Sequence, residues 1–324
     1  MPSGSTPTRP FGLLLLSLAF LIQPLAARAS EFDPGTLPYS ASFNGKTIQW
    51  REFAFFVMPG SERDLKLSLS MAAEVQIQAS AGIIDSKGPL TWHWQAPEQP
   101  GLVTIDIQPD GLAPMRLNVI VLVPASQAAD GYLNGYRIGQ YPEEPFRDNP
   151  VYLPPAGYIE VNPELMDLPV SPHFTLGQFL CKQQADHWPK YMVLREALVA
   201  KLEIILAEVN RRGIRTDSFV VMSGHRTPWY NHSIGNGRHS RHIWGGAADI
   251  FIDNIGNGRM DDLTGDGRSG LKDAQLLLDI IEDLYQTREH QRLHGGLGLY
   301  GPRPHRGPFV HVDARGFETR WVLP

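Results

Sequence analysis

Cysteine is nearly absent from this chain of 324 residues, in which Cys181 is the single thiol. One cysteine excludes an internal disulfide, so the fold must be stabilised by burial of apolar surface even in an oxidising compartment. Cys181 directly follows Phe179 and Leu180. Such a neighbourhood is typical of a small buried apolar residue and not of a nucleophile.

An excess of basic residues is also lacking. The chain has 29 Lys and Arg against 34 Asp and Glu. Residues 1–29 hold two of the bases, Arg9 and Arg28, and no acid, which leaves 27 bases against 34 acids and a net charge of about −7. This balance argues against nucleic acid as a partner bound through bulk charge.

Long hydrophobic runs are the third feature that the chain lacks. Phe11–Ile22, behind Arg9, is too short to span a bilayer as a stable helix, and no other apolar segment approaches the length of a transmembrane helix. It is followed by Ala27-Arg28-Ala29, the small-x-small pattern of signal-peptidase cleavage. We therefore predict a signal peptide over residues 1–29 and a periplasmic or secreted protein without a stable membrane span; a retained membrane anchor is the alternative.

Residues 30–129 have the period-2 pattern of β-strands, and turn residues such as Pro59-Gly60 and Pro109-Asp110-Gly111 separate the runs. The alternating apolar residues include Leu65, Leu67, Leu69, Val103, Ile105, Ile107, Leu117, Val119 and Val121. This pattern predicts a small antiparallel all-β sandwich. The segment Trp94–Gly101 resembles bacterial immunoglobulin-like modules. Because it contains no catalytic cluster, we expect a scaffold, with wall binding or spacing as alternatives.

The remainder of the chain divides into a linker and a second domain. Residues 130–171 are rich in Gly, Pro and Tyr and have almost no periodicity, which is typical of an ordered linker. Over residues 172–324, helical spacing occurs at Lys190–Asn210 and Asp273–Tyr285, and Ser218–Met222 has the composition of a strand. This mixed order predicts an α+β domain with an antiparallel sheet covered on one side by helices.

The stretch Ser223–Asp249 carries most of the chemistry, since it packs four His, three Arg and five Gly into 27 residues. His242 and Asp249 flank a Gly-Gly turn, and His311 lies on a predicted strand whose alternate side chains share a face. A His, Asp, His set without a fourth protein ligand leaves a water position, which is typical of a catalytic zinc site.

These motifs resemble a known superfamily. The ten-residue pattern Ser-x-His-x-x-Gly-x-Ala-x-Asp over Ser240–Asp249, together with SPHFTLGQFLCK, SGHRTP, GGLG and FVHVD, is similar to the zinc D-alanyl-D-alanine peptidases, which share their superfamily with the Hedgehog signalling domain. The resemblance covers roughly Leu133 to Trp321 and points to the bacterial periplasmic branch. It implies a Hedgehog/D,D-peptidase-like α+β fold, a zinc cofactor, and peptidoglycan stem peptides as substrate.

Three residues are candidates for contact with the substrate. Arg226 lies in SGHRTP, and a guanidinium can hold a carboxylate or an oxyanion through two parallel hydrogen bonds. The resemblance implies that it contacts substrate; a surface Arg without a role is the alternative. His225 stands where the related pattern usually has Tyr, so it is either a substrate contact or a polar filler. Ser240, which opens the ligand motif, is the third candidate.

The general base is not evident from the motifs. Many relatives have a Glu three residues before the last zinc His, and this chain has Pro308 there. Asp313 is the candidate substitute because it shares a strand face with His311, and orientation of a ligand or substrate is its alternative role. His239 is a further candidate for proton transfer.

A second metal site is predicted after the zinc motif. Asp262–Asp273 follows the calcium-loop template, with oxygens at positions one, three and five and Gly at six. The predicted ligands are Asp262, Thr264, Asp266, Arg268 and Asp273. Thr at position three and Asp at position twelve would weaken affinity, and the alternative is a Gly-rich turn with a helix N-cap at Asp273.

Two classes of function are compatible with these observations. The first is a zinc peptidase that hydrolyses stem peptides as an endopeptidase or a carboxypeptidase. The second is a zinc-holding binding or regulatory protein of the cell wall, a course similar to that of the Hedgehog domain. The complete His, Asp, His set with Arg226 favours the enzyme, and Pro308 favours the binding protein.

Overall fold

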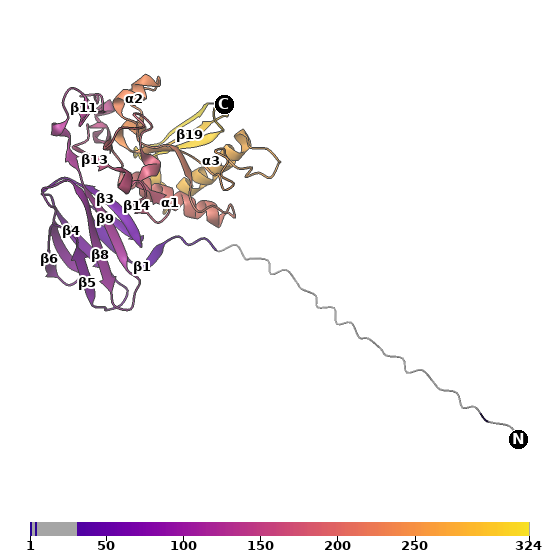
Figure 1. The fold of residues 1–324 in the computed structure, drawn as a ribbon, viewed down its shortest axis with the longest axis horizontal. Coiled ribbons are helices and arrows are strands. Elements are labelled where there is room, and N and C mark those ends of the chain that lie inside the picture. Colours follow the sequence, from indigo (N-terminus) through magenta and orange to yellow (C-terminus); the bar gives the residue numbers. More distant parts are fainter. Residues whose placement is uncertain (2–3, 5–30, 324) are drawn as a thin grey trace. The chain divides into compact units, whose positions relative to one another are not determined.

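The computed structural model in Figure 1 describes residues 1, 4 and 31–323. The predicted signal peptide therefore lies almost entirely outside the described residues. Contacts divide the chain into Met1–Glu31 and Phe32–Pro324, and every helix and strand described below belongs to the second unit. No helix among the described residues is long and apolar enough to cross a membrane.

The first part of the second unit is built from two packed β-sheets. One has the strand order β2-β1-β4-β7-β6 and the other β3-β9-β8-β5. The bounds are β1 Thr36–Phe43, β2 Lys46–Trp50, β3 Glu52–Val57, β4 Glu62–Ser68, β5 Val75–Ala79, β6 Ile83–Gly88, β7 Thr91–Gln95, β8 Gly101–Pro109 and β9 Met115–Val121. Phe43 of one sheet meets Phe55 of the other, with ring centroids 5.1 Å apart. The alternating residues Val103, Ile105 and Ile107 are buried in the core between the sheets.

One strand pair departs from the predicted antiparallel arrangement. β3 pairs in parallel with β9, from Glu52 opposite Arg116 to Val57 opposite Val121. A single residue, Arg51, separates β2 from β3, so the chain passes from one sheet to the other without reversing. Period-2 alternation identifies the buried face of a strand, but it contains no information on the direction of its neighbour.

The segment predicted as a linker contains short regular elements. Its strands and those next to it are β10 Val123–Pro124, β11 Tyr132–Leu133, β12 Tyr136–Arg137, β13 Gly157–Val161, β14 Pro169–Ser171, β15 Phe174–Thr175 and β16 Lys190–Met192. Its 3-10 turns are η1 Ala125–Gln127, η2 Phe146–Asp148, η3 Pro150–Tyr152, η4 Pro163–Leu165 and η5 Leu176–Phe179. β13 is the middle strand of the sheet β10-β13-β16, so this segment is part of the packed structure.

The last part of the unit is a five-stranded sheet with helices, which is compatible with the predicted α+β domain. Its strand order is β17-β18-β20-β19-β21. The elements are α1 Glu196–Arg211, β17 Val220–Ser223, α2 Pro228–Ser233, η6 Arg241–Trp244, β18 Ala247–Phe251, α3 Leu271–Gln286, η7 Gln291–Leu293, β19 Gly296–Tyr300, β20 Phe309–Asp313 and β21 Thr319–Leu323. α3 packs on β19 and β20 and also contacts α1. Contrary to the predicted antiparallel sheet, the edge pair β19–β21 is parallel, because the chain runs back along β20 and then crosses β19 to form β21 on its other side.

Candidate metal centre and the cavity around it

Three buried side chains from three elements converge at one point. Asp249 on β18 and His311 on β20 are directly paired across the sheet, so their side chains share a face. His242, on η6, reaches the same place from outside the sheet. His311 Nδ1 lies 2.9 Å from Asp249 Oδ1, and His242 Nε2 lies 3.3 Å from that oxygen and 3.2 Å from His311 Nδ1. Within the part of the chain that the structure describes, this is the one group of three acidic, His or Cys side chains close enough to hold a metal.

The turn between η6 and β18 depends on Gly245. Its backbone is left-handed, with φ of 60°, and a Cβ there would lie 2.1 Å from the carbonyl oxygen of Val193. Glycine satisfies both the positive φ and the close approach. The turn brings His242 back over Asp249, seven residues later in the chain.

Hydrogen bonds on the far side of each ring orient the two imidazoles. His242 Nδ1 lies 2.7 Å from the carbonyl oxygen of Gly224, which can only accept, so this nitrogen carries the proton. His311 Nε2 lies 3.2 Å from the Asp313 carboxylate. His242 Nε2 and His311 Nδ1 therefore present lone pairs toward Asp249, which is the arrangement of metal-ligating histidines.

The charge state of the centre also fits a cation. His242, Asp249 and His311 are 2%, 4% and 5% exposed. Burial lowers the pKa of His242, although the Asp249 carboxylate opposes this shift. Burial would raise the pKa of Asp249, but His242 and His311 hold it well below its usual range. Burial would lower the pKa of His311, but the carboxylates of Asp249 and Asp313 raise it above its usual range. A bound cation would replace the proton on His311 Nδ1, and two imidazoles with one ionised carboxylate are then a donor set suited to zinc.

Arg226 lies beside the three converging side chains. Its Nη2 is 2.6 Å from Asp249 Oδ2, and its Nε donates to Ser223 Oγ at 2.8 Å. The second carboxylate oxygen, Asp249 Oδ1, is left facing the histidines. The guanidinium also lines the cavity, so the predicted contact with substrate stays a prediction that the geometry permits.

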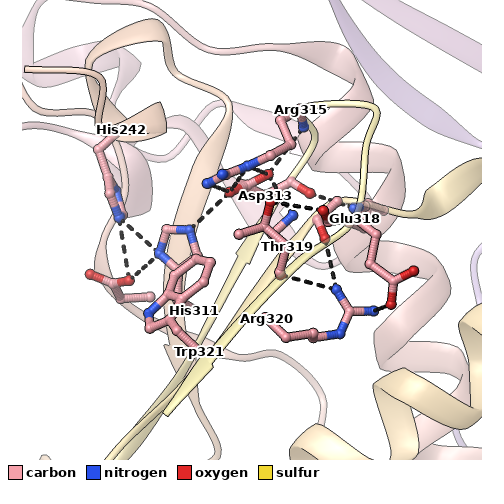
Figure 2. A network of polar contacts seen from close by, with 12 residues as sticks. His242, His311, Asp313, Arg315, Glu318, Thr319, Arg320 and Trp321 are labelled. Carbon is pink, nitrogen blue, oxygen red and sulfur yellow. Dashed lines mark hydrogen bonds and ion pairs between the residues drawn. The ribbon is translucent and has the colours of Figure 1, made fainter. Parts of the chain in front are cut away.

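Asp313 does not fit the predicted role of general base. It is 0% exposed and does not line the cavity. Its carboxylate accepts hydrogen bonds from His311, from the Gly296 amide, and from the guanidinium and amide of Arg315. Burial would raise the pKa of Asp313, but these bonds from His311 and Arg315 hold it far below its usual range. Figure 2 shows the Asp313 carboxylate between the His311 ring and Arg315, a position compatible with the orienting role that was its alternative from the sequence.

Of the other three site residues predicted from the sequence, two line the cavity and one is buried in the interior. Ser240 and His239 line the cavity. The His239 ring packs on Phe146 with centroids 4.5 Å apart, and burial and Arg238 lower its pKa, which favours the neutral ring; its role in proton transfer stays a prediction. His225 is 2% exposed and does not line the cavity, and neither ring nitrogen has a hydrogen-bond partner among the described residues. Burial lowers the pKa of His225 to about 3, so it is a neutral interior residue. This position favours the polar filler of the two alternatives, and the substrate contact stays a prediction.

The cavity is strongly cationic, which the sequence did not reveal. Its volume is about 650 Å³. The charged residues that line it, the histidines aside, are Arg226, Arg238, Arg241, Arg306, Arg315 and Asp249. Arg306 stacks over Phe309 at 4.6 Å and donates through Nη1 to the carbonyl oxygen of Gly301. In the sequence, the one indication for Arg306 was its place just before the strand that bears His311. That place does not determine whether the side chain points into the cavity or into solvent.

The predicted calcium loop is closed by its own hydrogen bonds. The Asp262 carboxylate accepts from the amides of Gly265, Asp266 and Gly267, and the Asp266 carboxylate accepts from the Arg268 amide. Asp273 is 1% exposed, and it accepts from the Gly270 amide and from the amide and hydroxyl of Thr264. The helix N-cap is Gly270, and Asp273 is the third residue of the helix. The N-cap considered at Asp273 was therefore placed three residues too late. Calcium binding here stays a prediction.

Residues 172–265 match the family model Peptidase M15. The matched segment contains His242, Asp249 and Arg226, and His311 lies beyond its end. The match supports a metallopeptidase domain of the zinc D-Ala-D-Ala peptidase superfamily, whose members depend on zinc. It supports hydrolase activity on a peptide substrate, and the His242, Asp249 and His311 cluster provides a possible metal site for it.

Other comparisons are distant. No curated protein matches the chain. A nucleoside hydrolase-related hypothetical protein from Saccharophagus degradans is 13% identical over 26% of this chain and 26% of its own length, with a TM-score of 0.19. The Yersinia pseudotuberculosis adhesin InvE is 17% identical over 28% of this chain and 29% of its own length, with a TM-score of 0.18. The titin M3 domain is 8% identical over 25% of this chain and 96% of its own length, also at 0.18. These likenesses carry no argument about fold or function.

Proposed function

We propose that this protein is a zinc peptidase that hydrolyses peptide bonds of peptidoglycan stem peptides, as an endopeptidase or a carboxypeptidase. The observation that carries the proposal is the convergence of His242 Nε2, His311 Nδ1 and Asp249 Oδ1 on one point at the wall of a cavity. All three side chains are buried, and each histidine is hydrogen-bonded through the ring nitrogen that faces away from the centre, His242 to the Gly224 carbonyl oxygen and His311 to Asp313. The proposal includes export through the predicted signal peptide to the periplasm or the cell exterior.

Different residues of the chain have different roles in the proposed hydrolysis. A zinc ion held by His242, Asp249 and His311 would polarise the scissile carbonyl and lower the pKa of the attacking water to about 7. Arg226 keeps the Asp249 carboxylate in position and is placed to donate hydrogen bonds to the developing oxyanion. His239, neutral and at the cavity wall, is the candidate to accept and return the proton.

The charge of the cavity supports an acidic peptide as substrate. Five guanidinium groups line it against the single carboxylate of Asp249. Guanidinium groups bind carboxylates through paired hydrogen bonds, and a concave site of one charge sign attracts ligands of the opposite sign. Stem peptides of peptidoglycan carry free carboxylates, so their charge suits this cavity.

A second function is favoured by one specific observation. Among the residues that line the cavity, Asp249 is the only carboxylate, and the position where relatives have a Glu is occupied by Pro308. A protein that retained zinc but lost efficient proton transfer would bind or regulate the cell wall without cutting it. This alternative predicts zinc binding without turnover.

Purified protein incubated with purified sacculi, with and without a chelator, distinguishes the two functions. The peptidase releases muropeptides, the chelator stops the release, and added zinc restores it. The identity of the released fragments defines the bond that is cut. Stoichiometric zinc without any released fragment would overturn the peptidase proposal in favour of the binding protein.

Calcium binding is proposed as a separate structural function of Asp262–Asp273. The supporting observation is that hydrogen bonds from the amides of Gly265 and Gly267 to the Asp262 carboxylate close this segment into a tight loop, with Gly267 at position six of the template. Gly265 and Gly267 both have positive φ, which permits the tight turn.

A further inference from the structure

Three exposed aromatic side chains lie on segments that contact one another, since Arg137 contacts Trp229 and His187 contacts Asn134. Among the described residues, the aromatic side chains classed as exposed are Tyr132, Trp188 and Trp229, at 41%, 37% and 38%. Tyr132 lies on the hairpin β11–β12, Trp229 lies on α2, and Trp188 precedes β16. Figure 1 shows β11 and α2 at the same end of the unit. Clustered exposed aromatic rings mark an interaction surface more often than scattered ones do.

Arg137 and Lys190 connect these side chains into one surface, here called the aromatic platform. Arg137 contacts the rings of Tyr132 and Trp229. Lys190, which lies over Trp188, donates to the carbonyl oxygen of Gln183, whose side chain is bonded to Arg137. Arg137 places its guanidinium 5.3 Å from the ring centre of Tyr132 and 4.4 Å from that of Trp229. Its Nε donates to Tyr132 Oη at 2.9 Å. Lys190 Nζ lies 5.1 Å from the ring centre of Trp188. The rings are thus held in place before any ligand arrives, which reduces the entropy lost on binding.

The platform also presents free hydrogen-bond donors. Within the described part of the chain, neither Nη of Arg137 has a hydrogen-bond partner, although its Nε is bonded to Tyr132. A stacked guanidinium with unused donors beside flat ring faces suits a ligand that has both an apolar face and hydroxyl or amide edges. Sugar rings have this character, because their C–H faces stack on aromatic rings and their hydroxyl and acetamido groups accept hydrogen bonds.

The platform is rigidly connected to the candidate active site. Gln183 Nε2 donates to the carbonyl oxygen of Arg137 at 2.6 Å, and Gln183 Oε1 accepts from Thr227 Oγ1 at 2.8 Å. Thr227 is the neighbour of Arg226, and it caps the helix that carries Trp229. Arg226 and Trp229 are three residues apart, so their Cα atoms are separated by at most about 11 Å.

We propose that the aromatic platform of Tyr132, Arg137, Trp188 and Trp229 binds the glycan strand to which the stem peptides are attached. The proposal rests on the proposed peptidase function for the identity of the polymer. A stem peptide in the cavity is covalently joined to its glycan, so the sugar chain must pass close to the cavity wall. Trp229 of the platform lies three residues from Arg226, and the platform offers the stacking surface that such a chain requires.

Glycan strands freed of their stem peptides are the decisive probe. Their dissociation constant is measured by titration calorimetry against the parent protein and against Tyr132→Ala, Trp188→Ala and Trp229→Ala. Each loss of a ring is expected to weaken binding about tenfold, a change of about 1.4 kcal/mol. Trp229→Phe, which retains a ring, is expected to keep most of the affinity. Ile83→Ala, at a 60% exposed apolar residue of β6, is the matched control and is expected to bind as the parent does.

The outcomes separate this inference from the proposed function. The probe contains no peptide bond, so its binding does not depend on hydrolysis, and failure here leaves the muropeptide assay to decide the peptidase proposal. Absence of binding by the parent overturns the inference, as does parent-like binding by all three alanine variants with parent-like melting temperatures. A second copy of this chain is the other possible occupant of the platform, and sedimentation velocity tests it. If the parent forms a dimer that the same variants abolish, and binds no glycan, the platform belongs to the dimer interface.

Discussion

Arg226 is the residue that best separates an enzyme from a zinc-holding protein. It holds Asp249 with one nitrogen and lines the cavity without being one of the three proposed ligands, so Arg226→Ala should weaken zinc affinity but still take up zinc when the metal is in excess. If it stabilises the oxyanion, kcat should fall by about 10²–10³, or about 2.7–4 kcal/mol of barrier. If it holds only a ground-state carboxylate, KM should rise while kcat stays nearly constant.

Muropeptide release by zinc-loaded protein is the measurement for Arg226→Ala, with zinc content as its control. Arg226→Lys should recover little, because an ammonium cannot reproduce the planar two-bond contact. Parent-like kinetics in Arg226→Ala would exclude a role in catalysis or substrate binding.

Asp313 is predicted to act on the metal through His311. Asp313→Asn keeps the shape of the side chain but weakens its hydrogen bonds to His311 Nε2 and to Arg315. Loss of such an orienting carboxylate typically costs 10- to 100-fold in metal affinity, so zinc affinity should fall by about that factor. Competition with a chromogenic chelator measures it. Asp106→Asn, at an exposed carboxylate paired with Arg116 on the sandwich, is the control, and equal zinc affinities in both variants would contradict the role.

At the scale of elements, the turn from η6 to β18 determines whether the ligands meet. Gly245→Ala should displace this turn, because its Cβ would lie 2.1 Å from the Val193 carbonyl oxygen. We expect loss of bound zinc and a lower melting temperature. Gly235→Ala is the matched control, since Gly235 also has a positive φ, of 76°, but its Cβ would meet nothing within 4 Å. Equal effects of the two substitutions would show that backbone strain, and not the close approach, governs the turn.

The loop Asp262–Asp273 is the second element with a testable property. If it binds calcium, millimolar calcium should raise the melting temperature, and Asp266→Ala should abolish the shift, because ligands that bind only the folded state stabilise it. Asp253→Ala is the control, since Asp253 accepts similar amide hydrogen bonds in the neighbouring loop but is outside the calcium template. An unchanged melting temperature of the parent would leave the loop as a turn.

At the scale of the whole molecule, the sandwich and the helix-bearing part share one apolar core. Glu196, at the start of α1, accepts hydrogen bonds from the Asn44 side chain and the Phe56 amide. Asn118 on β9 donates to the carbonyl oxygen of Pro169 on β14. Because burial is shared across the boundary, we expect one cooperative unfolding transition of residues 32–323 in calorimetry. Two separate transitions would show that the parts unfold independently.

The spacing of apolar residues and the local composition were sufficient to identify which segments form strands and which form helices. Alternation marked Val103, Ile105 and Ile107 as buried, and helical spacing marked Leu198, Leu202 and Ile205. These patterns are local, because a buried face repeats along the strand or helix that bears it. The two parallel pairs, β3–β9 and β19–β21, were missed, since the direction of a partner strand depends on the path of the chain between them.

The sequence by itself determined which side chains could hold a metal, because His242, Asp249 and His311 are recognisable by type and spacing. Only the tertiary structure decided what surrounds them. It directed Asp313 away from the cavity and toward Arg315, buried His225, and aimed Arg306 inward. Ligand chemistry belongs to residue types, whereas the direction of a side chain depends on neighbours that are distant in sequence. For the same reason Tyr132, Trp188 and Trp229, up to 97 residues apart in the chain, came together only in the folded protein.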